Sequence, residues 1–211
     1  MESSFPILIL ASNSPARAQV LSQINLKFLV IPSNIDENIS MENPHSYVKD
    51  LSFSKASTVG MRIKMKYDQY ITLGCDTIVI DPEQKLIGKP DDLSEAEKML
   101  KRLSGSSHLV ITGYSIIIYP AQISYQKIIS TEVIFRDLLD EEINFYLSTN
   151  EWKGKAGGYA IQGLGSLLIK EIKGDYYNVV GLPVNSIWQT LLDHYGEHLI
   201  EIVKKKGEKN N

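Results

Sequence analysis

One carboxylate interrupts a stretch of sequence that otherwise reads as a buried strand. In "LGCDTIVID", residues 73–81, Asp76 stands among aliphatic and β-branched residues that favour an extended, buried chain. Taking an ionised carboxylate out of water costs roughly several kcal/mol unless a cation or hydrogen bonds compensate it. Carboxylates kept in such places accept protons or hold metal ions, so Asp76 is the first candidate for catalysis.

Three polar residues, Ser12, Ser14 and Arg17, follow the apolar run at 5–10. Ser14 before Pro15 is typical of a helix start, with the serine as N-cap. The free N–H groups and positive end of such a helix bind anions, and the hydroxyls add donors. Arg17 is unfavourable at this end of a helix unless an anion lies there to take its two parallel hydrogen bonds. The segment predicts a phosphate site. The alternative that these residues alone leave open is an ordinary capped helix with a solvated arginine.

Further charged residues stand where apolar or neutral ones are expected. Lys55 shares a helical stripe with Val48 and Val59, so it takes the place of a core residue, although a lysine can also extend along such a face to reach water. Lys89 ends a short strand just before a proline, and Glu37 lies in a polar turn after a strand.

Together these residues suggest one kind of chemistry. Cations neutralise phosphate oxygens, and carboxylates bind Mg²⁺. The collection suits a metal-bound polyphosphate, and its members are Arg17, Glu37, Lys55, Asp76 and Lys89.

The elements that must position them alternate along the chain. Strands are expected at 5–12, 27–33, 70–81, 107–119 and 122–135, and a glycine-bent strand pair at 157–172. Helices are expected at 14–24, 44–65, 93–104 (with a capping box from Ser94 to Glu97), 137–148 and 183–195. The two long stretches around Pro120 are predicted to pair antiparallel, so the fold class is mixed α/β, with helices flanking a mixed sheet.

Composition limits the function classes. The chain has 211 residues, a formal net charge of −3 and one cysteine. We expect a single domain over 1–200 and a basic, solvated tail at 201–211, without a dividing linker. The single cysteine excludes an internal disulfide, so a cytoplasmic protein is predicted. Nucleic acid and membranes are not expected partners, because the sequence shows neither a basic face nor a membrane span.

Other reactive residue types have simpler interpretations. Cys75 is expected to be a small core residue, because no basic partner would activate its thiol. His194 and His198 share a helix face, but Gly196 and the lack of a third ligand argue against a metal site. His108 lies in a strand, where a hydrogen-bonded structural role is expected.

The sequence also resembles the Maf family of nucleoside triphosphate pyrophosphatases. The resemblance follows the motifs "LILASNSPARAQVL" (8–21), "DE" (36–37), "SKA" (54–56), "GCDTIVI" (74–80), "GKP" (88–90), "LSGSSHLVITG" (103–113), "KAGGYAIQGLG" (155–165) and "GDYYNVVGLP" (174–183). These blocks keep one order over most of the chain.

The resemblance implies a fold of two lobes around a deep cleft, a homodimer, and a reaction. Water attacks the α-phosphorus of a nucleoside triphosphate and releases the monophosphate and pyrophosphate, with a divalent cation, Mg²⁺ or Mn²⁺. It implies Asp76 as the proton acceptor, with Glu37 and Asp76 holding the metal. The other implied roles are Lys55, Lys89 and Glu37 in catalysis, Ser12, Ser14 and Arg17 in phosphate binding, and Thr77 and Gln162 in distinguishing bases.

One position departs from the family pattern. Members that prefer dTTP and UTP carry arginine at the place of Ala16, and those that prefer 7-methyl-GTP carry a large aromatic residue there. Thr77 and Gln162 match the first group, so dTTP, UTP or modified pyrimidine nucleotides are the expected substrates. The alternatives are a house-cleaning pyrophosphatase for purine analogues such as ITP or 7-methyl-GTP, and a non-enzymatic regulator of septum formation in cell division.

Overall fold

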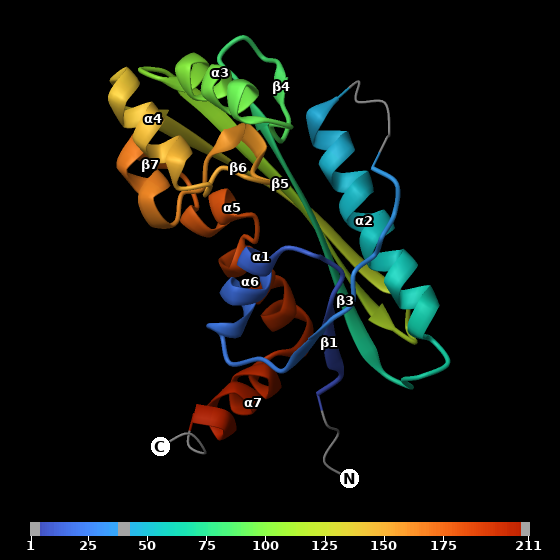
Figure 1. The fold of residues 1–211 in the computed structure, drawn as a ribbon. Coiled ribbons are helices and arrows are strands. Elements are labelled where there is room, and N and C mark those ends of the chain that lie inside the picture. The colour runs from blue at the N-terminus through green and yellow to red at the C-terminus, as the bar shows by residue number, and fades with distance from the viewer. Residues whose placement is uncertain (1–4, 38–42, 208–211) are drawn as a thin grey trace. The chain divides into compact units, whose positions relative to one another are not determined.

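Seven strands form one sheet in the computed structural model, which describes residues 5–37 and 43–207 except for the side chains of 202 and 204–207 (Figure 1). The strands are β1 Ile7–Leu10, β2 Phe28–Val30, β3 Tyr70–Ile80, β4 Leu86–Ile87, β5 Ser107–Tyr119, β6 Ile123–Phe135 and β7 Ile169–Lys173. Their order is β2-β1-β3-β5-β6-β7, with β4 paired to β3.

The sheet is mixed, as predicted. β1 pairs parallel with β2 and β3, because the intervening α1 and α2 carry the chain back across the sheet before each new strand. β3 pairs antiparallel with β4, and β6 with β7. β5 and β6 are neighbours joined by residues 120–122 alone, a connection short enough only for an antiparallel pair.

The helices confirm most of the predicted positions. They are α1 Pro15–Ser22, α2 Pro44–Ile63, α3 Leu93–Leu103, α4 Asp140–Ser148, α5 Tyr176–Val180, α6 Val184–Tyr195 and α7 Glu197–Gly207. Ser14 caps α1, as expected, and its side chain accepts a hydrogen bond from the backbone N–H of Arg17. The capping box predicted for α3 was wrong, because Asp92 precedes Ser94 as the cap and accepts from the N–H of Glu95.

Two compact units share the chain. Unit 1 takes in the described residues of Met1–Asp76, Gly113–Ile128 and Gly181–Asn211, and unit 2 comprises Thr77–Thr112 and Ile129–Val180. Strands β3, β5 and β6 contribute residues to both units, which explains why no linker was visible in the sequence. The deep cleft between two lobes that the resemblance implies stays a prediction.

Each unit has an apolar core of its own. In unit 1 a buried cluster joins β1, α2 and β3, with Ile9, Val59 and Tyr70 among its members. In unit 2 α3 and α4 pack with the strands around Leu100 and Phe135. Burial of these faces is the main favourable term that holds each unit together.

Two predicted segments differ in the structure. The strand pair expected at 157–172 consists instead of two 3₁₀ helices, η1 Ala156–Gly158 and η2 Gly163–Leu168, followed by β7 alone. Glycines with positive φ at 157, 158 and 163 turn the chain where a strand would run straight. At the C-terminus α7 continues to Gly207, so helix covers most of the segment expected as a tail, and residues 208–211 lie outside the described residues.

Candidate active site

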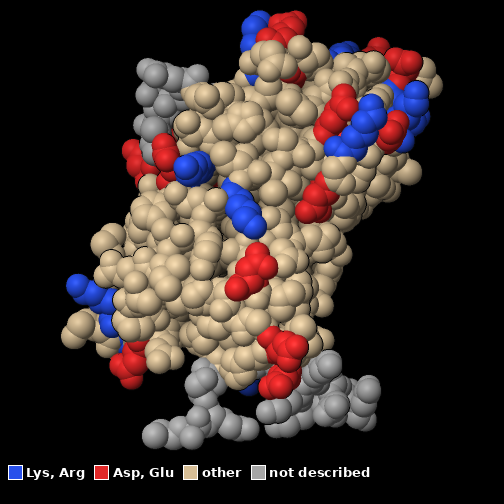
Figure 2. All heavy atoms as spheres, turned by 180° about the vertical axis from the view of Figure 1, so that it is seen from behind, with Lys and Arg blue, Asp and Glu red and all other residues tan. Residues whose placement is uncertain are grey.

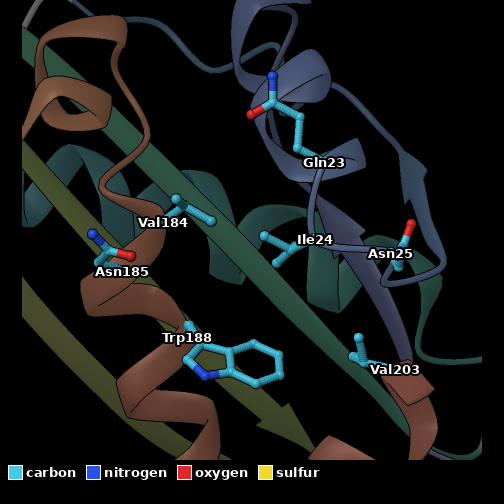
Figure 3. Close-up of a pocket in the computed structure, with 7 residues that line it drawn as sticks. All are labelled: Gln23, Ile24, Asn25, Val184, Asn185, Trp188 and Val203. Carbon is cyan, nitrogen blue, oxygen red and sulfur yellow. The ribbon is translucent and has the colours of Figure 1, made fainter. Parts of the chain in front are cut away.

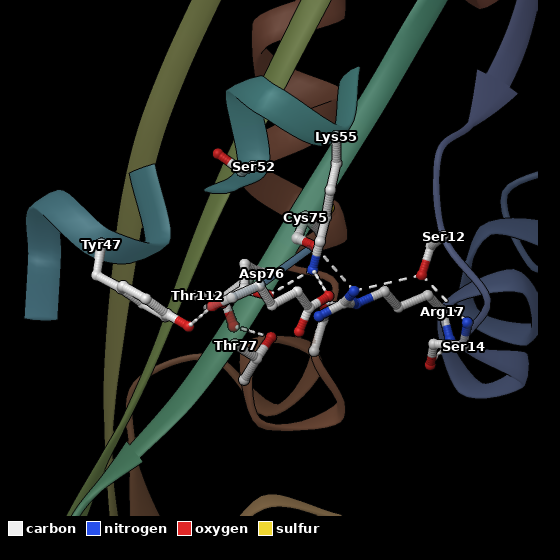
Figure 4. Close-up of polar contacts among 12 residues, drawn as sticks. Ser12, Ser14, Arg17, Tyr47, Ser52, Lys55, Cys75, Asp76, Thr77 and Thr112 are labelled. Carbon is white, nitrogen blue, oxygen red and sulfur yellow. Dashed lines mark hydrogen bonds and ion pairs between the residues drawn. The ribbon is translucent and has the colours of Figure 1, made fainter. Parts of the chain in front are cut away.

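Asp76 lies within unit 1 at the centre of a compact charged group. The residue is 7% exposed in a strand whose other members are buried, except Thr77. Its Oδ1 lies 2.6 Å from Nζ of Lys55, which reaches it from α2 (Figure 4). A buried carboxylate needs a compensating cation, and the ammonium of Lys55 is that cation.

Glu37 completes an arrangement of two carboxylates on one ammonium. Its Oε1 lies 2.7 Å from the same Nζ. The side chain of Lys55 is 8% exposed and that of Glu37 is 50% exposed, so the pair joins the interior to the surface. One ammonium is thus shared between two carboxylates.

Two glycines let α2 approach the sheet closely enough for this contact. A Cβ at Gly74 on β3 would overlap the carbonyl oxygen of Ser52, and one at Gly113 on β5 would overlap that of Val48. The stripe of α2 that includes Val48 and Lys55 is buried against the strands. The position of Lys55 therefore depends on the absence of side chains from the facing strands.

The turn between β1 and α1 lies beside the same part of β3. Residues of β1 pair parallel with β3, and the N–H of Ala11 donates to the carbonyl of Leu73 at 2.8 Å. Arg17 in the first turn of α1 donates from Nε to Gly181 O at 2.8 Å and from Nη1 to Cys75 O at 2.9 Å. Its guanidinium is thus fixed next to Asp76 through the main chain of the preceding residue.

Hydrogen bonding in this turn orients the hydroxyl of Ser12. Its Oγ accepts from the N–H of Ser14 at 3.1 Å and from Nη1 of Arg17 at 3.3 Å. With both lone pairs engaged, the hydroxyl proton is left as a donor. The hydroxyl of Ser12, the positive end of α1 and the guanidinium of Arg17 form a group suited to an anion.

Cys75 contributes its main chain to the site rather than its sulfur. Its side chain is fully buried, and burial raises the pKa of the thiol to about 11. A thiol with this pKa stays protonated at neutral pH and is a poor nucleophile. The expected core role agrees with this placement.

The sequence of this chain is similar to those of known proteins. Residues 7–194 match the family described as Maf-like protein. The chain belongs to the Maf family. A relative in a Thermoanaerobacter species, named dTTP/UTP pyrophosphatase, is 43% identical over 193 residues, which cover 92% of this chain and 99% of that protein. A relative of the same name in Pyrococcus furiosus is 45% identical over 181 residues, which cover 84% and 90%.

Among solved structures, a nucleoside-triphosphatase / dITP/XTP pyrophosphatase from Mycobacterium abscessus matches 63% of this chain and 75% of its own. The TM-score is 0.35 and the sequence identity 11%.

Other predicted site residues of this Maf-family chain belong to unit 2. Lys89 is exposed just after β4, Gln162 is half-buried before η2, and Thr77 follows Asp76 in β3. Ala16 lies in unit 1, half-buried in the first turn of α1. The structure thus gathers Ser12, Ser14, Arg17, Glu37, Lys55 and Asp76 within unit 1, and describes Thr77, Lys89 and Gln162 in unit 2.

Thr77 is part of a directed chain of hydrogen bonds inside unit 2. Oγ1 of Thr112 lies 3.2 Å from Asn178 O, and since a carbonyl only accepts, Thr112 donates its proton there. Thr77 must then be the donor in its 2.9 Å contact with Thr112. Any further partner of Thr77 Oγ1 has to donate to it. The buried side chain of Asn178 is itself bonded to Val110 O and Thr131 Oγ1.

Sequence reasoning missed Tyr47, Thr112 and Asn178. Tyr47 lies on α2, and its hydroxyl donates to Glu37 O at 3.0 Å. Burial, followed by the charges of Asp76 and Glu37, raises the pKa of this phenol, which stays neutral. A tyrosine in a helix and polar residues in strands carry no local signal of such distant partners.

His108 has the hydrogen-bonded position expected for it. Its Nε2 lies 2.7 Å from the hydroxyl of Tyr159, and the ring is 2% exposed. Burial lowers the pKa of the imidazole to about 4. His108 is therefore a neutral part of the unit-2 core at physiological pH.

A separate pocket in unit 1 has different chemistry. Its volume is about 260 Å³, and it is lined by Gln23, Ile24, Asn25, Val184, Asn185, Trp188 and Val203 (Figure 3). These lining residues are apolar or carry amides and none is charged, so the pocket does not suit a polyphosphate.

The surface charges and the lengths of the helices are relevant to nucleic acid and membranes as partners. On the face in Figure 2, lysine and arginine side chains lie close to aspartate and glutamate side chains. No helix within residues 5–37 and 43–207 is long and apolar enough to cross a membrane. That the protein does not bind nucleic acid stays a prediction.

Proposed function

We propose that this chain is a nucleoside triphosphate pyrophosphatase, a hydrolase of acid anhydrides that releases a nucleoside monophosphate and pyrophosphate. The observation that carries the proposal is Asp76, paired with Lys55 and Glu37 beside the donor-rich turn of Ser12 and Arg17. Family membership and the names of the relatives support the same activity.

The residues divide the reaction between them. Ser12, the start of α1 and Arg17 hold phosphate oxygens, and Lys55 adds positive charge. A water oxygen forms a bond to the α-phosphorus, and one of its protons passes to Asp76. The bond from the α-phosphorus to the bridging oxygen breaks, and pyrophosphate leaves with the electron pair. Positive charge close to the leaving group lowers the barrier to this step.

We also propose a divalent cation, Mg²⁺ or Mn²⁺, as a cofactor. Within the described residues, no three His, Cys, Asp or Glu side chains come together as a metal site. Glu37 and Asp76 nevertheless meet at one ammonium, and two carboxylates suffice where substrate phosphates supply further oxygens. These two residues would hold the ion, which when bound neutralises phosphate charge.

dTTP and UTP are the proposed substrates, because the relatives carry these nucleotides in their names. The test is a panel of dTTP, UTP, CTP, GTP, ITP and 7-methyl-GTP with Mg²⁺ or Mn²⁺. We expect release of pyrophosphate, fastest with dTTP and UTP. When the reaction is run in ¹⁸O-water, we expect the label in the monophosphate. Orthophosphate as the first product would refute attack at the α-phosphorus. Preference for ITP or 7-methyl-GTP would refute the pyrimidine assignment, and inactivity on the whole panel would favour a non-enzymatic regulator.

A cytoplasmic homodimer is proposed from the sequence and the family resemblance. Light scattering of the purified protein tests the oligomeric state, with twice the chain mass of 23.7 kDa expected. Fractionation of source cells tests the location.

A further inference from the structure

Glu37 is held from α2 at both its side chain and its main chain. Lys55 binds the carboxylate, with Nζ 2.7 Å from Oε1, and the hydroxyl of Tyr47 donates to the carbonyl oxygen at 3.0 Å. Tyr47 and Lys55 lie about two turns apart on the same helix. The two contacts fix different parts of one residue to one rigid element.

The segment that carries Glu37 has no secondary structure of its own. Residues 31–37 follow β2 without forming a helix or strand. Near the end of α2, Arg62 donates to Pro32 O at 2.8 Å and to Ser33 O at 2.7 Å. The helix therefore anchors this segment at 32–33 through Arg62 and at Glu37 through Tyr47 and Lys55.

The donor in this contact is a neutral group. The phenolic hydroxyl of Tyr47 fixes the main chain of Glu37 at 3.0 Å without adding a charge that would compete with Lys55.

We propose that Tyr47 is a positioning residue for Glu37. Its hydrogen bond to the main chain fixes the point from which the Glu37 carboxylate reaches Lys55 beside Asp76. The consequence for catalysis rests on the proposed function, because it assigns Glu37 to the phosphate-handling site. An orientation that is already set before substrate binds helps the transition state more than the ground state.

Tyr47→Phe tests the proposal by removing one oxygen atom. We expect kcat for UTP to fall by about 5- to 20-fold, with KM changed less than about twofold, since charge is retained and only orientation is lost. In a Glu37→Gln background the same substitution should have no further effect on kcat, because the group that Tyr47 positions is already disabled.

A second readout does not depend on activity. Hydrogen–deuterium exchange should become faster in a peptide covering residues 31–37 of Tyr47→Phe, and remain unchanged elsewhere. Tyr70→Phe is the matched control, because its hydroxyl also donates to a main-chain carbonyl, that of Gly60, at 2.8 Å. This control should leave kcat and the exchange of residues 31–37 as in the wild type.

The outcomes separate this proposal from the proposed function. Unchanged exchange at 31–37 in Tyr47→Phe would overturn the positioning role, whether or not the protein is active. An equal loss of kcat in both backgrounds would also overturn it, because Tyr47 would then act independently of Glu37. Faster exchange at 31–37 in Tyr47→Phe, together with a wild-type protein that releases no pyrophosphate, would support the positioning role and refute the proposed function.

Discussion

Unit 1 gathers charged side chains, whereas the unit-2 residues expected to distinguish bases are uncharged. In unit 1 Lys55 joins Asp76 and Glu37, and Arg17 lies fixed beside them. In unit 2 Thr77 is held by Thr112 in a chain of hydroxyls and amides, and Gln162 is half-buried. Charge suits the triphosphate, which every nucleoside triphosphate shares. Neutral groups of fixed polarity suit the bases, which differ in their donors and acceptors.

Asp76→Asn is the strongest test of the charged group in unit 1. We expect kcat to fall by about 100-fold or more, the usual range for a lost proton acceptor. The change in stability should be small, because Glu37 still pairs with Lys55 and a buried charge is removed. Pyrophosphate release and urea denaturation measure the two effects. Near-normal turnover by a folded Asp76→Asn protein would remove Asp76 from its assigned role.

A pair of lysine variants compares a buried cation with an exposed one. Lys55→Ala leaves Asp76 buried without its ammonium, so we expect a loss of about 3 kcal/mol in unfolding free energy and roughly 100-fold in kcat/KM. Lys89 is exposed, so Lys89→Ala should keep its stability and lose about tenfold in kcat/KM. If both variants turn over UTP like the wild type, the lysines are ordinary charges and do not meet phosphate.

The buried imidazole of unit 2 predicts a pH effect on stability. The folded pKa of His108, about 4, is lower than the unfolded value near 6.5, so the unfolded chain binds the proton more tightly. Stability is therefore complete above about pH 6.5 and falls as the pH drops towards 4. At pH 5 the loss should be about 2 kcal/mol relative to pH 7.5. Urea denaturation of His108→Asn at both pH values is the comparison, and an equal pH dependence in this variant would contradict the effect.

Local sequence signals located much of unit 1 but less of unit 2. Asp76 and Lys55 were found because each breaks an apolar pattern, and Ser14 because its place before a proline marks a helix start. Tyr47 breaks no pattern, so its contact with Glu37 was invisible. The bond between Thr112 and Asn178 joins residues far apart in the chain, which periodicity cannot relate. Gly157 and Gly163 turn the chain with positive φ because of tertiary packing, whereas the apolar composition of the segment favoured the prediction of strands.

Ala16→Arg tests how the phosphate turn contributes to base preference. An arginine at this half-buried position adds donors and a planar group next to Arg17. We expect the ratio of kcat/KM for dTTP to that for GTP to rise by about tenfold, the value of one charge-assisted contact. Ala18→Arg is the matched control, since residues two apart lie on nearly opposite faces of α1. An unchanged ratio in Ala16→Arg would mean that position 16 does not meet the substrate.

Thr112→Val tests the uncharged hydrogen-bonding groups of unit 2 without changing any charge. It removes the acceptor to which Thr77 donates, so the contact with position 112 no longer sets the direction of the Thr77 hydroxyl. In the wild type that hydroxyl accepts from any further partner, which suits the N3–H of uracil and opposes cytosine, whose N3 is an acceptor. We therefore expect the ratio of kcat/KM for UTP to that for CTP to fall about fivefold, equivalent to one neutral hydrogen bond. Thr190→Val in α6 loses a similarly buried hydroxyl within unit 1 and should leave the ratio unchanged. If Thr112→Val also leaves it unchanged while remaining folded, the direction of the Thr77 hydroxyl does not select the base, and Gln162 becomes the residue to vary next.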